Sequence, residues 1–383
     1  MIGPPPACPR HSVEEPRLRQ GRVVFMLDKG VRGKGMRQIR IAAMVIAAAL
    51  AVSGLAGCKN SYRNYEKIDI EQLEEQKTGE TEKAPDEEFS KPVAMRPGAD
   101  RDSYLGGARL TLLANQSDSQ MLSCVIESRK GSVIVVDGGT EYDADHLAET
   151  IRDKGGHVAV WLVTHPHSDH VGALTKLLSD SQYGDLTIDN IYYSIEPQEW
   201  YEEFDSEFQS GRAAMVAQFR EAVETKLPAE KRHEYSEAGT KFSVDEITIT
   251  ILNKPYLIHG FNAINDSSVA YLLHINQKKV IFLGDMGPKA GQMFIADYED
   301  RLEWLDCDVL QMAHHGQYGV EEDVYRVLNP EICLWPTPGW LWDNMKNGVV
   351  DAGDWDTINV RGWMDQIGVD RNLCIKDGDQ VLE

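Results

Sequence analysis

The stretch T-H-P-H-S-D-H-V-G-A-L, residues 164–174, places three of the chain's 11 histidines and one aspartate within six positions. The continuous apolar run V-A-V-W-L-V-T (158–164) comes directly before them and is typical of a strand buried on both faces. The segment that follows, V-G-A-L-T-K-L-L-S-D, has the spacing of a helix. The histidines are therefore predicted to lie on a short loop between a central strand and a helix, where a rigid scaffold can hold functional groups.

The chain upstream of this loop predicts further regular elements. The segments A-R-L-T-L-L-A-N, M-L-S-C-V-I-E-S and G-S-V-I-V-V-D-G-G indicate three successive strands separated by turns. The segment D-A-D-H-L-A-E-T-I-R-D-K-G-G indicates a helix, with Asp143 as its N-cap and Gly155 at its end. Globular structure is thus expected from about residue 105 onward.

The side chains of the loop are of the types that bind divalent metals. His165 and His167 are two residues apart, so their imidazoles can converge on one cation from an extended backbone. Asp169 and His170 stand where the chain turns into the helix and can face a second cation. The alternative is a set of solvated histidines that caps a helix, which we would favour for one lone histidine but not for this pattern.

Two later strand ends carry ligand-type side chains as well. The run K-K-V-I-F-L-G-D-M ends at Gly284-Asp285, and C-D-V-L-Q-M-A-H-H-G-Q ends at His314-His315. An aspartate at a strand end can bridge two metals with its two oxygens. Either segment alone could be an ordinary turn, but three such strand ends in this order favour one shared metal site.

This order of motifs resembles the metallo-β-lactamase superfamily of metallohydrolases. The resemblance covers roughly residues 105–383, and we assign residues 104–383 to one hydrolase domain. It implies an α/β fold, an αββα sandwich of two mixed sheets flanked by helices. The segment V-V-D-G-G (135–139) also matches, and Asp137 is expected to contact the metal ligands from behind.

The resemblance implies two divalent metal ions at one edge of the sheets. By match to the family's motifs, the expected ligands are His165 and His167 for the first metal, Asp169 and His170 for the second, Asp285 as the bridge, and His315 as the last ligand. Residues His314 and His315 could exchange roles; we favour His314 as a hydrogen-bond donor to the substrate. Zinc is the first choice of metal, with manganese or iron as alternatives.

The sequence departs from the family at one ligand. Many members have a further metal-binding histidine about 20 residues before the bridging aspartate, where this chain has N-A-I-N-D-S-S-V-A-Y with Asn265. His259 comes slightly early, and His274 lies within a predicted strand. The N-D-S-S stretch and the H-H-G ending instead resemble the branch that contains the metallohydrolase domain of DNA-uptake competence proteins and the phosphorylcholine esterases of teichoic acid.

The implied reaction is hydrolysis by a hydroxide that bridges two cations, with Asp169 and Asp285 orienting it. The branch favours a phosphodiester as substrate, either a small molecule or a component of the cell envelope. Asn265 is a candidate substrate contact. Trp340 and Trp342 could cage a quaternary ammonium such as choline, and the alternative is that these tryptophans pack a loop.

Residues 36–57 have the layout of an export signal. Two arginines form a short basic region, and residues 41–52 form an apolar stretch too short for a comfortable membrane span. The ending L-A-G-C at Cys58 resembles the bacterial lipoprotein signal, in which this cysteine is lipidated. We therefore expect a lipid anchor at Cys58 on the extracellular face of the cell membrane; the alternative is a signal-anchor helix with an incidental cysteine.

Residues 1–35 are unexpected upstream of such a signal. We interpret them as a non-native extension, with translation starting at Met36. Residues 58–103 are rich in Glu, Lys, Asp and Pro and poor in large apolar side chains, so a disordered acidic tether is predicted.

The body of the protein is strongly acidic. Residues 1–57 contain 9 Lys+Arg and 3 Asp+Glu, which leaves 30 and 58, a net of −28, for residues 58–383. A groove for long nucleic acid needs a basic surface, so a nucleic-acid partner is not expected. The four cysteines of the domain are widely spaced and are predicted to be free, buried thiols, namely Cys124, Cys307, Cys333 and Cys374.

Residues 195–240 read as an insertion. Met215, Phe219 and Val223 recur every four residues, as on one face of a helix. This segment could form a lid over the site or pack on the sheet. The oligomeric state is left open.

The sequence favours an envelope-anchored metallophosphodiesterase over four alternatives. These are an extracellular nuclease of the competence type, a lactone or thioester hydrolase, a non-catalytic metal-binding lipoprotein, and a β-lactamase. The acidic balance disfavours the nuclease, and the intact H-x-H-x-D-H motif disfavours a binding protein without catalysis.

Overall fold

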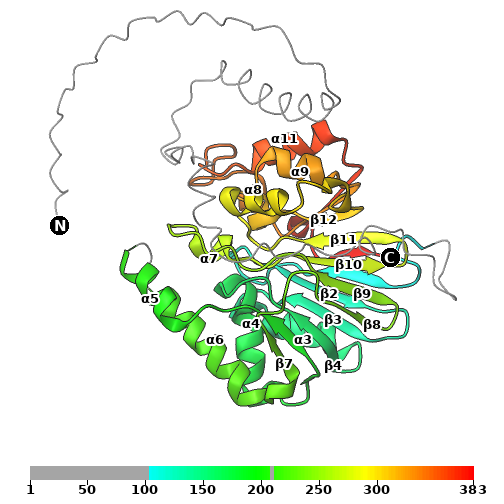
Figure 1. The fold of residues 1–383 in the computed structure, drawn as a ribbon, viewed down its shortest axis with the longest axis vertical. Coiled ribbons are helices and arrows are strands. Elements are labelled where there is room, and N and C mark those ends of the chain that lie inside the picture. The colour runs from blue at the N-terminus through cyan, green and yellow to red at the C-terminus, as the bar shows by residue number, and fades with distance from the viewer. Residues whose placement is uncertain (1–102, 208–210) are drawn as a thin grey trace, which may run out of the picture. The chain divides into compact units, whose positions relative to one another are not determined.

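The computed structural model describes residues 103–207 and 211–383, which form four layers in the order helices, sheet, sheet, helices (Figure 1). The αββα sandwich is therefore confirmed. The predicted signal peptide, the tether and Cys58 lie outside the described residues. Among the helices that the structure describes, none is both long enough and apolar enough to span a membrane.

The first sheet is antiparallel at one edge and parallel in its centre. Its strands follow the spatial order β15 (Gln380–Leu382), β1 (Arg109–Leu112), β2 (Ser123–Glu127), β3 (Val133–Asp137), β4 (His157–Leu162), β6 (Ile191–Tyr193) and β7 (Arg232–Glu234), with β5 (Thr187–Ile188) also paired to β4. The three strands predicted upstream of the histidine loop are β1, β2 and β3, and the buried run before that loop is β4.

The second sheet has the same mixed character. Its strands follow the order β14 (Arg371–Cys374), β13 (Ile332–Trp335), β12 (Val309–Gln311), β11 (Lys278–Phe282), β10 (Tyr271–Ile275), β9 (Ile247–Ile251) and β8 (Lys241–Val244). The pairs from β11 to β14 are parallel, and the others are antiparallel.

Each sheet buries side chains on its two faces. In β3, Ile134 and Val136 belong to the core between the sheets, whereas Val133 and Val135 belong to the core under the outer helices. This alternation follows from the two-residue repeat of a strand. It explains why the central strands read as continuous apolar runs in the sequence.

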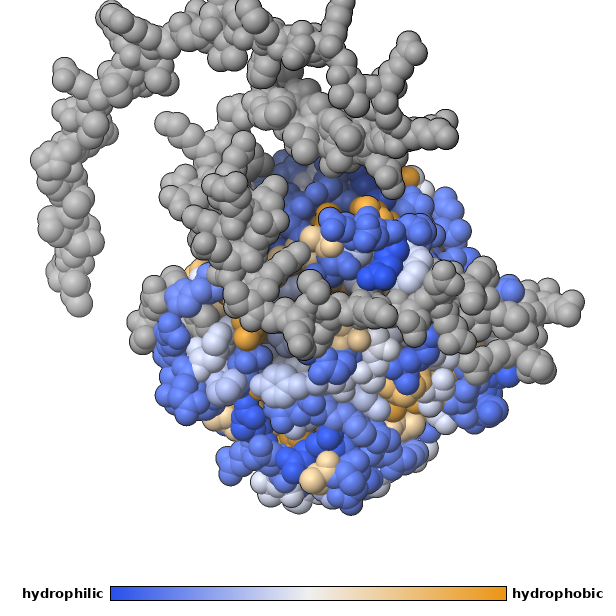
Figure 2. Space-filling model, viewed as in Figure 1, coloured by the Kyte–Doolittle hydropathy of each residue, from blue (hydrophilic) through white to orange (hydrophobic). Residues whose placement is uncertain are grey.

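Helices cover the outer face of each sheet (Figure 1). The first sheet is covered by α3 (Ala144–Arg152), α4 (Ser168–Ser179) and α6 (Arg212–Lys226), and the second by α8 (Pro288–Asp297), α9 (Glu322–Leu328) and α11 (Thr357–Ile367). The shorter or peripheral helices are α5 (Gln198–Glu207), α7 (Ala263–Asp266) and α10 (Gly339–Trp342). The face of the molecule in Figure 2 is mostly hydrophilic, with hydrophobic side chains in small, separate patches.

Two helix predictions are refined by the structure. Asp143 does occupy the N-cap position of α3, but its side chain makes no cap bond there. Its carboxylate instead accepts hydrogen bonds from the backbone and hydroxyl of Thr140 at 2.8 and 2.6 Å. The insertion contributes α5 and α6, and α6 packs beside α4 with Phe219 and Val223 fully buried. Helix α6 is therefore part of the helical layer.

The four domain cysteines are free and buried, as the sequence predicted. Burial raises the pKa of the Cys124 and Cys307 thiols well above the ordinary value, so these thiols stay protonated and unreactive. They act as small apolar side chains of the core.

The topology gathers four strand ends at one edge. Strands β3 and β4 are parallel and joined through α3, and β11 and β12 are parallel and joined through α8. The carboxyl ends of parallel strands meet on the same side, where open α/β sheets place their ligands. Each of these four ends carries predicted site residues.

Candidate metal centre

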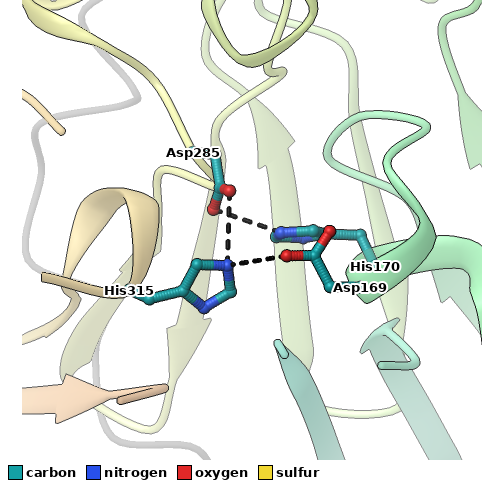
Figure 3. Close-up of side chains that lie close together, drawn as sticks. All are labelled: Asp169, His170, Asp285 and His315. Carbon is teal, nitrogen blue, oxygen red and sulfur yellow. Dashed lines mark ion pairs between the residues drawn. The ribbon is translucent and has the colours of Figure 1, made fainter. Parts of the chain in front are cut away.

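Six of the predicted side chains converge at this edge in two overlapping groups. One group is His165, His167 and Asp285, and the other is Asp169, His170, Asp285 and His315. Within each group the candidate donor atoms lie within 4.8 Å of one another. Figure 3 shows the second group, with Asp285 and His315 from the second sheet facing Asp169 and His170 from the first.

The first group sits in the loop between β4 and α4. The Nε2 atom of His165 lies 3.0 Å from the Nδ1 atom of His167 and 3.8 Å from Oδ2 of Asp285. Two imidazole nitrogens that face each other at this distance need a proton or a cation between them. His165 is fully buried, whereas His167 at the N-cap of α4 is only partly buried.

The second group is tighter. The Nε2 atom of His170 lies 3.2 Å from Oδ1 of Asp285, and the Nε2 atom of His315 lies 3.3 Å from Oδ2 of the same carboxylate. His315 Nε2 is also 3.4 Å from Oδ2 of Asp169. Asp285 thus presents Oδ1 to His170 of the second group and Oδ2 to His165 and His315, one histidine from each group, so its carboxylate is shared by both groups.

The outer nitrogens of these rings are already engaged by the protein. Nδ1 of His170 donates to Asp137 at 2.7 Å, and Nδ1 of His315 donates to the carbonyl of Pro336 at 2.9 Å. These bonds leave the lone pair of each Nε2 atom aimed into the cluster. Partners of this kind fix the tautomer and orientation of metal-binding histidines.

A divalent cation fits the donor set. Within the described residues, His170 Nε2, His315 Nε2 and Asp285 Oδ1 are buried and have no hydrogen-bond partner. Unpaired buried polar atoms are uncommon and call for an explanation such as an ion. Imidazole nitrogens and carboxylate oxygens suit zinc, and carboxylates together with imidazole also suit iron or manganese.

Asp137 lies behind the cluster, as expected from its place at the end of β3. Its carboxylate accepts from the backbone NH and the hydroxyl of Thr164 and from His170, each at 2.7 Å. Asp137 is fully buried. It therefore connects β3 to the start of the histidine loop and sets the orientation of the His170 ring.

Three of the ten non-glycine residues with positive φ in the described part of the chain lie at this edge of the sheets. Asp137, His314 and His315 have φ angles of 55°, 49° and 55°, a region that residues other than glycine seldom adopt. Gly284, at φ 60°, precedes Asp285, and a Cβ there would lie 2.7 Å from the side chain of Thr164. Part of the backbone strain thus lies where side chains must be aimed at the cluster.

Buried charge makes the metal-free cluster hold protons. Burial lowers the pKa of His167 to about 3, so its ring is neutral. Burial acts in the same sense on His315, but the carboxylates of Asp285 and Asp169 outweigh it and raise its pKa to about 9. Burial also opposes the charged form of His170, yet Asp285 and Asp137 raise its pKa well above the ordinary value. The carboxylates therefore require positive charge, which either protons or cations can supply.

This balance predicts a pH-dependent metal affinity. Below about pH 9, His315 carries a proton that a cation must displace, and so does His170, whereas His167 carries none. Affinity at the second group is therefore expected to rise about a hundredfold per pH unit between pH 6 and pH 9, a factor of ten for each proton released, with a weaker trend at the first group. Chelator competition at pH 6, 7, 8 and 9 measures this, and an affinity independent of pH at both sites would contradict it.

His314 and Asn265 lie beside the cluster at its more open side. The side chain of His314 is 14% exposed, and its Nε2 atom is 3.9 Å from Asp285 Oδ2 and 3.2 Å from the amide nitrogen of Asn265. The amide of Asn265 also donates to Asn262 at 2.9 Å, and its buried Oδ1 has no partner among the described residues. The structure thus brings together two residues that the sequence suggested as substrate contacts.

The two histidines of the H-H-G motif differ in burial, and this difference separates their roles. His315 is fully buried against Pro336 and points at two carboxylates, as a ligand should, whereas His314 is partly exposed. His315→Ala is expected to weaken binding of one metal by more than about 10²-fold. His314→Ala is expected to keep the metal content and to lower kcat by about 10²-fold.

Metal analysis and steady-state kinetics on these two variants test the division of roles. Each variant is the control for the other because the substitutions are adjacent and identical. Equal loss of metal from the two variants would show that both histidines are ligands.

Trp340 and Trp342 have different surroundings. The ring of Trp342 packs edge-to-face on Trp335 with centroids 5.1 Å apart, and the guanidinium of Arg361 lies 4.1 Å from its centroid. Its face is thus taken by this chain's own cation, and its contacts do not support the expected role in substrate binding. Trp340 donates to the carbonyl of Asp118 at 2.8 Å and lies 5.9 Å from the ring of Trp355.

The sequence analysis missed two glutamines near the cluster. Gln120 donates to Oδ2 of Asp169 at 3.3 Å, and Gln317 donates to Gln120 at 2.7 Å. Gln120 precedes β2 and Gln317 follows β12, so this pair connects the two halves of the sandwich. No spacing rule in the sequence links residues 197 positions apart.

A two-sheet sandwich with a cluster of histidines and aspartates at its parallel strand ends defines a metal-binding α/β protein. The model of the metallo-beta-lactamase superfamily matches residues 119–335, more than half of the 383 residues, and the chain belongs to this superfamily. Members typically bind divalent metals, often two, and metal-dependent hydrolysis is the activity that the fold suggests.

Solved structures resemble the chain at low identity. The metallo-beta-lactamase fold protein YhfI from Bacillus subtilis is 12% identical, with 72% of this chain and 99% of that chain covered and a TM-score of 0.44. CmlA, a diiron beta-hydroxylase from Streptomyces venezuelae, is 13% identical, with 72% and 54% covered and a TM-score of 0.43. The chain thus spans about half the length of CmlA. No curated protein matches this sequence.

Proposed function

We propose that this protein is an envelope-anchored, metal-dependent phosphodiesterase. The observation that carries the proposal is the carboxylate of Asp285, which belongs to both donor groups. One group adds His165 and His167 and the other adds Asp169, His170 and His315, so there are donors for two adjoining cations. Two adjoining cations held by these residues would activate a water and would neutralise charge on the oxygens of a phosphoryl group.

The carboxylates of the centre differ in their exposure to solvent. Asp137 is fully buried and the side chain of Asp285 is only 1% exposed, whereas the side chain of Asp169 is 17% exposed. Asp169 is therefore the carboxylate that can orient an attacking water. Gln120 donates to its Oδ2 atom and holds it in place.

His314 and Asn265 supply the complementary contacts. They lie beside Asp285, with the amide nitrogen of Asn265 3.2 Å from Nε2 of His314, and a phosphoryl oxygen bound there would take over the amide hydrogen that now faces His314. Donors fixed in advance stabilise charge that develops in the transition state. Many members of the superfamily have a further histidine that binds the first metal. At the corresponding position this chain has Asn265, whose side chain is a neutral amide.

The choice of phosphodiesters over other substrates rests on the sequence. The N-D-S-S stretch and the H-H-G ending resemble the branch associated with phosphodiester hydrolysis. The net charge of −28 over residues 58–383 disfavours a nuclease. Hydrolysis of a lactone or a thioester would use the same metal centre, so activity assays must distinguish these substrates from phosphodiesters.

The first test measures metal content and turnover on the full chain. We expect close to two metals per chain and hydrolysis of bis-p-nitrophenyl phosphate, with Asp169→Ala retaining the fold but losing turnover. p-Nitrophenyl phosphorylcholine tests a choline ester, and a lactone and a thioester test the alternative. Two metals without hydrolysis of either phosphodiester would reject the proposal and leave the fold assignment intact.

Anchoring is tested separately because it depends on residues outside the described ranges. We expect the wild-type chain in the membrane fraction and the Cys58→Ser variant in a soluble or unprocessed form. Identical fractionation of the two would argue against a lipid at Cys58.

A further inference from the structure

A groove of about 770 Å³ runs along the outer helical layer, between α4 and α6. Its volume is in the range of small-molecule binding sites. One end is formed by Ser119 and Ser168. Ser168 lies between the candidate ligands His167 and Asp169, and Ser119 adjoins Gln120, which donates to Asp169. None of the candidate ligands lines the groove itself, but this end of it is formed by their neighbours in the chain.

The walls of the groove are regular stripes on two helices. The α4 wall is formed by residues spaced three to four apart, Ser168, Val171, Thr175 and Ser179. The α6 wall has the same spacing, with Gln218, Ala222 and Thr225. Such spacing puts side chains on one helix face. Because α4 has 12 residues at 1.5 Å each, the groove can follow it for about 17 Å from the centre.

The chemistry of the lining is mixed and close to neutral. Hydroxyl and amide groups alternate with small apolar side chains, and the charged lining residues are two lysines and two glutamates, Lys176, Lys226, Glu141 and Glu221. A long polyanion would need an excess of basic groups. A segment that carries many hydroxyls on a carbon skeleton matches alternating polar and apolar contacts.

The insertion creates this groove. Helix α6 belongs to residues 195–240 and buries Val216, Phe219 and Val223 in the core under the first sheet. The opposite stripe of the same helix, which carries Gln218, faces α4 across the groove. Figure 1 shows α6 running beside α4 on the outer side of the sheet. The insertion is thus anchored firmly enough to form a fixed wall.

We propose that the groove between α4 and α6 binds a neutral, hydroxyl-rich segment of the substrate, such as a sugar or polyol esterified to the phosphate. This inference rests on the proposed phosphodiesterase activity and adds the class of alcohol that the enzyme recognises. The segment extends along α4 from the end of the groove formed by Ser119 and Ser168, and the hydroxyl of Thr225 and the amide of Gln218 contact it. The hydroxyl of Thr175 donates to the carbonyl of Val171 and accepts from the segment.

The test compares two substrates that share a leaving group, using the metal-loaded full chain. The first is methyl p-nitrophenyl phosphate, which ends at the centre, and the second is the p-nitrophenyl phosphodiester of glucose at O6. We expect wild type to prefer the glucosyl ester. In Thr175→Trp the indole fills the groove, and kcat/KM for the glucosyl ester should fall at least about tenfold, with less than about a twofold change for the methyl ester.

Two further variants distinguish the loss of contacts in the groove from misfolding of the variant. Gln218→Ala adds no bulk and should lower kcat/KM for the glucosyl ester about fivefold through a lost hydrogen bond. Glu149→Trp places the same indole on the exposed face of α3, outside the groove, and should change neither substrate. No preference in wild type, or equal effects of Thr175→Trp on the two esters, would overturn the inference.

A binding measurement separates failure of the inference from failure of the proposed activity. Maltotriose, chitotriose and ribitol are titrated into wild type and Thr175→Trp by calorimetry. One outcome is that wild type hydrolyses neither ester but binds one of these probes, and Thr175→Trp does not bind it. The groove is then a binding site, and the proposed phosphodiesterase activity is wrong. Turnover of the methyl ester with no probe bound and no glucosyl preference rejects the groove alone.

Discussion

Replacing Asp285 with asparagine is expected to remove metal from both donor groups and to lower kcat by at least about 10³-fold. Asp285 offers one oxygen to His170 and the other to His165 and His315. An amide has one acceptor oxygen and no charge, so it cannot hold two cations. Loss of metal catalysis removes several kcal/mol of transition-state stabilisation, and each 1.4 kcal/mol is a factor of ten in rate.

The matched control is Asp379→Asn, which disrupts another aspartate–histidine pair. Asp379 contacts His146 at 3.0 Å at a partly exposed position directly before β15, and it belongs to neither candidate donor group. Metal content by plasma mass spectrometry and turnover of bis-p-nitrophenyl phosphate should be lost in Asp285→Asn and retained in Asp379→Asn. An Asp285→Asn variant that keeps two metals would show that this carboxylate does not bridge.

The positions of the ligand-type residues could be predicted from the sequence because the signal is local. Histidines and aspartates follow apolar runs directly, and parallel strands end on the same side of a sheet. His165 and Asp285 are 120 positions apart in the sequence, yet the position of each could be predicted from the apolar strand directly before it. Because parallel strands end on the same side of a sheet, these two local predictions also place the residues at the same edge of the fold.

Roles that depend on contacts across the fold could not be predicted in this way. His314 and His315 are equivalent in the sequence, and they are distinguished by the burial of His315 and by the carbonyl of Pro336, which accepts from its Nδ1 atom. Gln120 reaches Asp169 from the loop before β2, a segment without any motif of its own. Such side-chain partners come from packing, which no periodicity reports.

The tryptophan-rich segment shows how one local pattern admits two interpretations. Residues 334–344 bring aromatic rings close together in the sequence, which allows either a cage for a cation or the packing of a loop. In the structure Trp335 is fully buried, and Arg361 lies over the face of Trp342. The cation that Trp342 attracts is a residue of the next helix, α11, so the cation–π contact stabilises the fold.

Replacing Asp137 with alanine is expected to lower the free energy of unfolding of the metal-free protein by about 3–5 kcal/mol. The substitution leaves the backbone NH and hydroxyl of Thr164 and Nδ1 of His170 without an acceptor, all fully buried. Removing one member of a buried charge pair typically has an effect of this size. Denaturant unfolding of wild type and variant after chelation measures it.

Asp137→Asn separates stability from metal binding. The asparagine oxygen can still accept from the backbone NH of Thr164, so the loss of stability should be smaller than in Asp137→Ala. When His170 is neutral, as a metal ligand must be, the asparagine amide can donate to its Nδ1 atom. That donation reverses the tautomer, however, and places a hydrogen on Nε2, the atom that faces Asp285 at 3.2 Å. Metal affinity is therefore expected to fall 10- to 100-fold in Asp137→Asn despite near-normal stability. If the asparagine variant binds metal like wild type, Asp137 serves only to hold β3 to the histidine loop, and the ring of His170 is oriented by its packing alone.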